Sequence, residues 1–382
     1  MTAFCHPSPL VAPPLGIPSF RQKYTTVMPW LDFQSYSIAL NLALFVIAAG
    51  VVWVAGSRIS GYADGIATQT GLDQAFVGLL FLALATETPE IGTTMTATVT
   101  GNAPLALGNL FGGVVMQTAI LAVVDLTVVR GALTFFTPRP VLLLQGILLT
   151  MLLGLALAAV TAGELFAFFG VGLWTVLLFG AYVLTLYLSH RYQGRERWHP
   201  DTPVAELLEG EEAQDAAAMR KEYAEWSLRR LSLFFVGGSL VILVAGVVLA
   251  RIGEALAAQT GLGSTFVGAT LLAISTSLPE LSTAIAAARL GNYSMAVSNI
   301  FGSNGIMVAL LFLADLFYRE GPILAAGDAA STFTVAMGIV VTAAYLAGLV
   351  ERRDQVFLRM GLDSVAVLVL YLGSLVVLYW IS

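Results

Sequence analysis

Two glutamates stand three residues apart inside a long apolar segment, in the stretch FLALATETPEIGTTM at Phe81–Met95. Glu87 and Glu90 flank Pro89, and threonines lie on both sides of them. A charged side chain at the centre of a bilayer costs at least about 2.5 to 3.5 kcal/mol, so a buried acid needs a partner. The stretch contains no lysine or arginine. A cation taken from solution is therefore the natural candidate for that partner.

The composition places this stretch in a membrane protein. Of 382 residues, 58% are hydrophobic and 11% are charged, against roughly 45 to 50% and about 25% in soluble domains. A membrane span needs about 20 mostly apolar residues, and the chain offers about ten such runs. They lie near residues 35–56, 76–100, 103–126, 140–160, 165–188, 232–252, 266–289, 292–317, 330–350 and 363–381. The sequence predicts an all-α membrane protein with the lipid bilayer as its surroundings and no nucleic-acid partner.

The chain contains an internal duplication at a constant offset of 190 residues. Between Ala55 and Leu126, 27 of 72 positions are identical to the residue 190 positions later. The matches include polar residues that chance similarity between apolar helices does not explain. They are Gln69/Gln259, Thr86/Thr276, Pro89/Pro279, Glu90/Glu280, Asn102/Asn292, Asn109/Asn299 and Asp125/Asp315. Repeats of this kind indicate two copies of one structural unit.

Five spans in each half force the two copies to cross the membrane in opposite directions. The fold class expected is therefore about ten transmembrane helices in two inverted five-helix repeats. Inverted repeats place a binding site near the bilayer midplane, built from interrupted helices. Proline has no backbone N–H, so Pro89 should release the carbonyl of Ala85, and Pro279 that of Ser275. Irregular backbone at this depth survives only when it is buried in protein or lines a wet cavity.

The residues around the two prolines are oxygen donors on one helix face. Thr86 and Thr276 each lie one turn before a glutamate, Glu90 or Glu280, so hydroxyl and carboxylate share a face. Oxygen ligands suit a hard ion such as calcium or sodium. The candidate ligands are Glu90, Glu280, Glu87, Thr86, Thr276 and Ser277, with Asn109, Asn299, Ser303 and Asn304 in direct or one-water roles. Helix-packing hydrogen bonds are the alternative role for the hydroxyl and amide groups.

Other residues limit the classes of function that are possible. Cys5 is the single cysteine, and the three histidines fall outside the predicted spans, which excludes a cysteine-rich metal site and disfavours a membrane hydrolase. No enzymatic activity and no cofactor are expected. Asp125 and Asp315 fall near span ends, where a hydrated structural role is expected. A channel would reuse the same ligands but need a continuous pore, and a purely structural membrane protein would not need the acids.

The predicted organisation has four parts. A proline-rich tail (1–34) precedes the first five-helix half (35–188), a linker loop (189–231) and the second half (232–382). Basic residues gather in cytoplasmic loops, and a cytoplasmic linker places fourteen of the eighteen lysines and arginines inside. Both termini are then non-cytoplasmic, in what we expect to be a bacterial inner membrane. The sequence assigns no oligomeric state.

The sequence resembles the calcium/cation antiporter superfamily, whose sodium/calcium exchangers carry two alpha-repeats. STSLPEL at Ser275–Leu281, followed by SNIFGSNG at Ser298–Gly305, is similar to the second repeat of that family. ATETPEI and GNLFGGVV resemble a divergent first repeat. The resemblance implies a central calcium site, and alternating access in which sodium or protons drive calcium transport.

The resemblance also implies roles for single residues. Glu90 and Glu280 match the paired central glutamates. Further matches are Thr86 and Thr276 around the ion sites, Ser277, the motif serine Ser303, and Ala83 and Ala273 as donors of backbone carbonyls.

The chain departs from the family at four positions: Glu87 and Gly113 replace serines, and Gln117 and Met307 replace asparagine or aspartate. Methionine is a poor calcium ligand, so one oxygen ligand is lost and one carboxylate is gained. Calcium/sodium exchange is the leading hypothesis for the function, and exchange of calcium or another cation for protons is the alternative.

Overall fold

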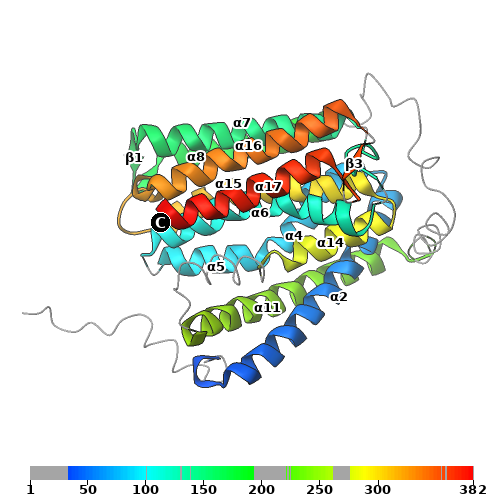
Figure 1. Ribbon diagram of the computed structural model, residues 1–382, viewed down its shortest axis with the longest axis horizontal. Helices are drawn as coiled ribbons and strands as arrows, with labels where there is room; N and C mark the ends of the chain where they lie inside the picture. The colour runs from blue at the N-terminus through cyan, green and yellow to red at the C-terminus, as the bar shows by residue number, and fades with distance from the viewer. Residues whose placement is uncertain are drawn as a thin grey trace, which may run out of the picture.

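The structure is a computed structural model that describes residues 33–192, 221–260 and 276–381, apart from residues 100, 130, 138, 222, 224, 354 and 358. Residues 1–32 of the predicted tail, most of the predicted linker loop, Ala273 and Ser275 lie outside the described residues. The described part is built almost entirely of helices, together with two short β-hairpins (Figure 1). The expected fold class, an all-α membrane protein, is confirmed.

The first half contains one helix of 33 residues followed by a broken helix. Helix α2 (Ile38–Thr70) begins at Ser37, whose hydroxyl accepts the Leu40 N–H, and ends at Gly71, whose φ of 70° suits glycine. The broken helix comprises α3 (Gln74–Val77), a π-helical turn η3 (Gly78–Leu82), α4 (Ala83–Thr86) and α5 (Thr88–Val99). Then come α6 (Ala103–Thr127), α7 (Pro140–Ala162), the hairpin β1 (Ala167–Phe168) and β2 (Val171–Gly172), and α8 (Leu173–Tyr192).

The described part of the second half repeats most of these elements. Its elements are α11 (Leu228–Thr260), α14 (Leu278–Arg289), α15 (Tyr293–Phe317), η5 (Ile323–Ala326), α16 (Ala329–Glu351), β3 (Val356–Phe357), β4 (Met360–Gly361) and α17 (Leu362–Ile381). Helices α2 and α11 both have 33 residues, α5 and α14 both have 12, and α6 and α15 both have 25. The duplication seen in the sequence is therefore a duplication of structure.

The number and ends of the spans refine the prediction. Among the described residues, eight helices are long and apolar enough to cross a membrane, or nine if the bent pair Gln74–Thr86 and Thr88–Val99 counts as one span. The tenth expected span, 266–289, is described only from residue 276 onward. The span expected at 165–188 begins later, because residues 167–172 form a hairpin before α8.

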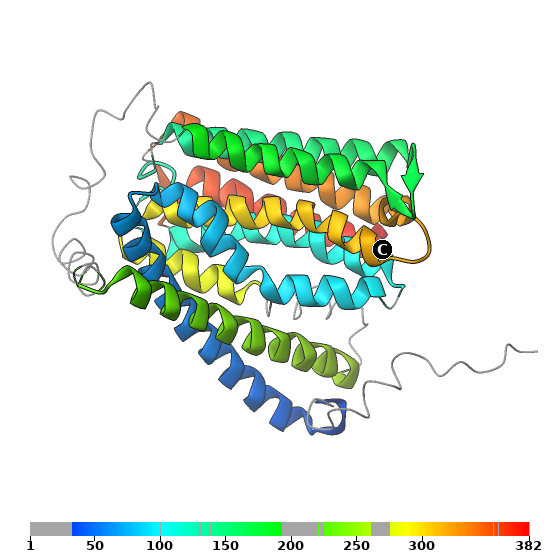
Figure 2. The ribbon, with the colours of Figure 1, turned by 180° about the vertical axis from the view of Figure 1, so that it is seen from behind.

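The two repeats are inverted in space. Figure 1 shows the hairpin that contains β1 and the hairpin that contains β3 at opposite ends of the helix bundle. Helices α2 and α11 pack together at one edge of the molecule and run in opposite directions (Figures 1 and 2). Their ends are joined by equivalent bonds: Gln259 Nε2 donates to the Tyr36 carbonyl at 2.7 Å, and Gln69 Nε2 donates to the Trp226 carbonyl at 2.5 Å.

The α2/α11 pair touches the broken helices through two glycines at equivalent positions. Gly56 on α2 lies against Ser282 on α14, and Gly246 on α11 lies against Pro89 on α5. A Cβ at either glycine would overlap its neighbour. Each helix of the pair therefore crosses the proline-containing helix of the other repeat at close range.

Two buried aspartates fasten each repeat to the other. Asp125 on α6 accepts the N–H groups of Leu133 at 2.7 Å and of Gly361, beside α17, at 2.8 Å. Asp315 on α15 accepts the N–H groups of Ile323 at 2.6 Å and of Gly172, beside α8, at 2.7 Å. Their exposures are 0% and 1%. The structural role is as expected, but the expected hydration is wrong, because the loop and hairpin fold over each carboxylate and replace water as the hydrogen-bond donor.

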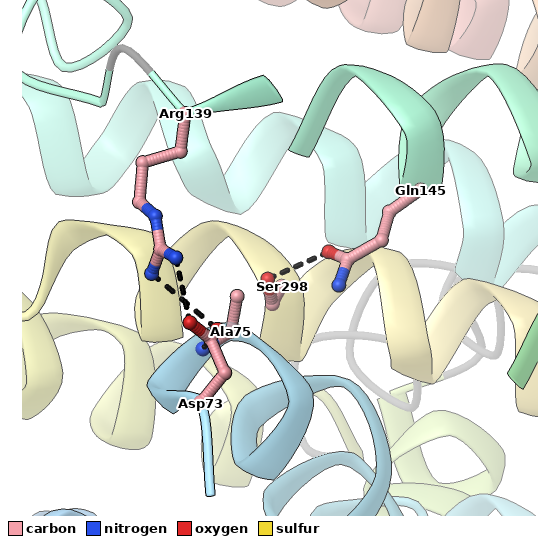
Figure 3. A network of polar contacts seen from close by, with 5 residues as sticks. All are labelled: Asp73, Ala75, Arg139, Gln145 and Ser298. Atoms are coloured by element: carbon pink, nitrogen blue, oxygen red, sulfur yellow. Dashed lines mark hydrogen bonds and ion pairs between the residues drawn. The ribbon is translucent and has the colours of Figure 1, made fainter. Parts of the chain in front are cut away.

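An ion pair holds the start of the broken helix against α7. Arg139, just before α7, bonds Asp73 through Nη2–Oδ2 at 2.6 Å and Nη1–Oδ1 at 3.3 Å, and Asp73 also accepts the Ala75 N–H (Figure 3). Farther along α7, Gln145 Oε1 accepts the hydroxyl of Ser298 on α15 at 2.7 Å. The ion pair anchors the start of the first broken helix beside α7, and the Gln145–Ser298 bond joins α7 to α15.

Replacing Arg139 with glutamine should lower the free energy of unfolding by about 1–2 kcal/mol, because a two-point charged contact with little solvent exposure is lost. Thermal unfolding of the purified protein in detergent measures the change. Arg353→Gln is the matched control, since the Arg353–Glu351 pair is more than half exposed on both sides and should contribute little. Equal effects of the two substitutions would contradict the anchoring role.

Candidate ion-binding site

The first broken helix changes direction at Glu87. The segments Gln74–Thr86 and Thr88–Val99 are bent by 51° relative to each other. Pro89 has no N–H to donate, and the carbonyl of Ala85 instead accepts the Thr88 hydroxyl at 3.2 Å. The predicted interruption is present, but a neighbouring threonine uses the released carbonyl. The π-helical turn η3 just before the break is a feature that is frequent at functional sites.

The second repeat begins its short helix at the equivalent place. Ser277 precedes α14 with φ −87° and ψ 3°, and Pro279 occupies the first turn. Both short helices thus start beside a proline and carry a glutamate, Glu90 or Glu280, in the first turn. The amino-terminal end of a helix favours a negative charge. The backbone therefore helps to place both carboxylates in the interior.

Glu90 and Glu280 are both buried in the interior of the protein, within electrostatic range of each other. Their exposures are 1% and 0%, and Glu87 also lies within electrostatic range of both. Among the described residues, none forms a hydrogen bond of good geometry with the carboxylate oxygens of Glu90 and Glu280. No lysine or arginine occurs in 59–129, 252–288 or 290–318. Buried carboxylates without protein donors are suited to bind a cation.

The threonines pair with the glutamates across the repeats. The Thr276 hydroxyl lies beside the Glu90 carboxyl, and the Thr86 hydroxyl lies beside the Glu280 carboxyl. Thr86 Oγ1 also donates to the Ala83 carbonyl at 3.1 Å, and that carbonyl accepts the Glu87 N–H at 3.0 Å. The structure thus unites Thr86, Thr276, Glu90 and Glu280, each threonine facing the acid of the opposite repeat.

The repeated asparagines connect helices beside the site. Asn109 on α6 donates to Thr94 Oγ1 on α5 at 3.0 Å, and Asn299 on α15 donates to Thr283 Oγ1 on α14 at 3.0 Å. These bonds fix the short helices against the long ones, which is the packing role. Asn299 Oδ1 is buried and has no hydrogen-bond partner within the described ranges. It remains available to a ligand.

Glu87 is the third buried carboxylate, with an exposure of 0%. Gln117 on α6 donates to its Oε1 at 2.6 Å, and the Ser303 hydroxyl on α15 lies beside the same carboxyl. The sequence identified Gln117 only as a departure from the family pattern and did not place it beside Glu87. Contact between residues thirty positions apart has no signal in a single sequence.

Ser277 has a different environment from the other candidate ligands. Its hydroxyl points to Met116 Sδ at 3.8 Å. Ala273 lies outside the described residues, so its predicted carbonyl role stays a prediction. Across the described ranges, no three His, Cys, Asp or Glu side chains form a ready metal cage. The candidate donor set is two buried glutamates with hydroxyl and amide groups near them.

Comparison with known proteins identifies the family. The sequence profile described as "Sodium/calcium exchanger protein" matches residues 40–188 and 231–380. The antiporter candidate CaxA of Alkalimonas amylolytica is 28% identical over 69% of this chain and 77% of its own length. The sodium/calcium exchanger MaX1 of Methanosarcina acetivorans is 32% identical over 32% of this chain and 33% of its own length.

Solved structures agree on the fold. A structure of the sodium-calcium exchanger NCX_Mj, soaked with sodium and strontium, superposes with a TM-score of 0.66 and 15% identity, covering 89% of this chain and 99% of that chain. The eight or nine apolar helices among the described residues and the antiporter relatives make the protein an integral, multi-pass membrane transporter and not an enzyme. The chain belongs to the sodium/calcium exchanger protein family, and it is an antiporter for calcium or a related cation.

Proposed function

We propose that the protein exchanges calcium for sodium by alternating access, at a site formed by Glu90 and Glu280. The observation that supports this most is the meeting of two buried carboxylates from opposite repeats, without a basic residue in the surrounding spans. Two carboxylates balance one divalent ion. Thr86, Thr276 and Asn299 add uncharged oxygen donors, the type that calcium and sodium bind.

Exchange follows from competition for the same carboxylates. An empty site holds mutually repelling charges in a medium of low dielectric, where such repulsion is strong. Reorientation of the empty carrier is therefore unfavourable, whereas a calcium-loaded or counter-ion-loaded carrier can reorient. The contacts of Gly56 and Gly246 place the α2/α11 pair directly over the two short helices that hold the glutamates. Movement of that pair is the proposed route by which the site opens to either side.

Proton coupling is the second candidate, and Glu87 is the observation that favours it. Calcium neutralises only two of the three buried carboxylates, so the third must take a proton or a monovalent cation. Protons could then drive transport in place of sodium.

Calcium uptake into proteoliposomes tests both candidates. Vesicles loaded with sodium, with an acidic interior, or with neither are diluted into ⁴⁵Ca²⁺ at a clamped membrane potential. Sodium coupling predicts saturable uptake with the outward sodium gradient; uptake with the outward proton gradient alone would assign protons. Uptake that needs neither gradient and does not saturate would indicate a channel and contradict the proposal.

A further inference from the structure

Because the chain is duplicated, each residue around the ion site can be compared with the residue at the equivalent position of the other repeat. Around the central glutamates, Glu87 corresponds to Ser277, Gln117 to Met307, and Ser303 to Gly113. Glu87, Gln117 and Ser303 are named the polar flank here, and Ser277, Met307 and Gly113 the apolar flank. If the repeats were functionally equal, the two flanks would offer equivalent ligands.

In the polar flank, Glu87 and Gln117 are joined by a hydrogen bond, whereas the Ser303 hydroxyl and other oxygen atoms remain without a partner among the described residues. Gln117 donates to Glu87 Oε1 at 2.6 Å, and Ser303 lies beside the same carboxyl. All three side chains have an exposure of 0%. Glu87 Oε2 and Gln117 Oε1 have no hydrogen-bond partner among the described residues. A buried acceptor without a donor is unfavourable, so both oxygens would gain from a cation.

The apolar flank is filled by a methionine. A Cβ on Gly113 would lie 2.7 Å from Met307 Sδ and would overlap Met307 Cε, so the end of the Met307 side chain occupies the space that a side chain at 113 needs. Met307 is 1% exposed. The remaining polar group, the Ser277 hydroxyl, is directed at the sulfur of Met116 at 3.8 Å. Thioether sulfur is a weak acceptor and a soft ligand.

The difference continues one residue farther along α6 and α15. Next to the polar-flank residues, Asn304 Nδ2 donates to Thr118 Oγ1 at 3.0 Å, and both side chains are fully buried. The counterparts of Asn304 and Thr118 are Val114 and Val308, both 1% exposed. The asymmetry is therefore a property of a whole helix contact and not of one substitution.

We propose that Met307, seated against Gly113, closes one flank of the ion site to hard cations, so that flanking counter-ions bind on the polar flank only. Calcium and sodium bind through several oxygen atoms, whereas in the described part of the apolar flank the one side-chain hydroxyl, of Ser277, points to the sulfur of Met116. Met307 thereby sets how many counter-ions the protein exchanges for each calcium. This inference rests on the proposed exchange function and adds the number and position of its counter-ions.

The test is to copy the polar flank onto the apolar flank. Met307→Gln combined with Gly113→Ser introduces the residues that stand at the equivalent positions of the other repeat. The measurement is the membrane potential at which net ⁴⁵Ca²⁺ flux stops in proteoliposomes with fixed calcium and counter-ion gradients, which reports the number of counter-ions per calcium. We expect the null potential of the double variant to shift by the amount that one additional monovalent cation produces.

The converse variant keeps the test informative if the first double variant does not fold. Glu87→Ser with Gln117→Met gives two of the three polar-flank positions the residues of the apolar flank, and the number of counter-ions should fall. Met337→Gln, on α16 and in neither flank, controls for a glutamine introduced into a span and should leave the null potential unchanged. Null potentials equal to wild type in both double variants would overturn the inference alone. A wild-type protein without counter-ion-dependent uptake would instead overturn the proposed function.

Discussion

Glu90→Gln should reduce calcium uptake by about 100-fold or more. Two unit charges about 4 Å apart at an effective dielectric of 20 interact by about 4 kcal/mol, and each 1.4 kcal/mol is tenfold in affinity. A carboxamide of the same shape keeps the oxygen but loses the charge that attracts a divalent ion. Because Glu90 and Glu280 lie together at the centre, Glu280→Gln should have an effect of similar size.

Thermal unfolding shows whether a variant has lost calcium binding or has failed to fold. Calcium that binds the folded state stabilises it by about 2.7 kcal/mol at 100 times the Kd, so wild type should unfold at a higher temperature when calcium is added. Glu90→Gln should fold and lose this calcium-dependent shift. Glu225→Gln, at an exposed position before α11, should keep both uptake and shift. Normal calcium uptake by either central variant would contradict the proposed site.

Asp315→Ala should lower the free energy of unfolding by about 3–5 kcal/mol, the range for breaking a buried charged network. The substitution leaves the N–H groups of Gly172 and Ile323 without an acceptor. It also removes the 2.7 Å bond from the hydroxyl of Thr175, which keeps only the Gly172 carbonyl at 2.9 Å. Gly172 and Thr175 belong to the first repeat, so the hairpin before α8 should detach from α15. Denaturation in detergent, followed by loss of the monodisperse peak on size exclusion, measures the effect.

The control for this prediction is an aspartate with one local role. Asp328 caps α16 by accepting the Ser331 N–H at 2.8 Å, and replacing such a cap with alanine costs about 1 kcal/mol. Asp125→Ala should resemble Asp315→Ala, because Asp125 makes the equivalent bonds to Leu133 and Gly361. If Asp315→Ala destabilised no more than Asp328→Ala, the fastening of one repeat to the other would be wrong.

The sequence predicted the features that depend on local chemistry and on the duplication. Pro89 predicted the interrupted helix, because a missing N–H acts on the adjacent turn whatever surrounds it. The constant offset predicted matched helices in the two halves, and hydropathy located helices such as Tyr293–Phe317 almost to the residue. Glu90 and Glu280 were predicted as ion ligands because acids in apolar spans need partners. Both are buried, and their role as ligands stays a prediction.

The features that the sequence did not predict are contacts between distant segments. Thr86 was expected beside Glu90 on its own helix, but it also faces Glu280 of the other repeat. Asp125 and Asp315 were expected to be hydrated because they are near span ends, yet folded loops bury them. The sequence identified Met307 as a poor ligand. It did not predict the contact between Met307 and Gly113, because that contact depends on three-dimensional packing. Such contacts leave no trace in the local pattern of one chain.

The most direct test of the central claim is an experimental structure with bound calcium, in which the ion is located by its anomalous scattering. The account predicts one calcium ion between α5 and α14, at about 2.3–2.6 Å from carboxylate oxygens of both Glu90 and Glu280. Calcium bound at another place, or an ion held by only one of these two glutamates, would contradict it.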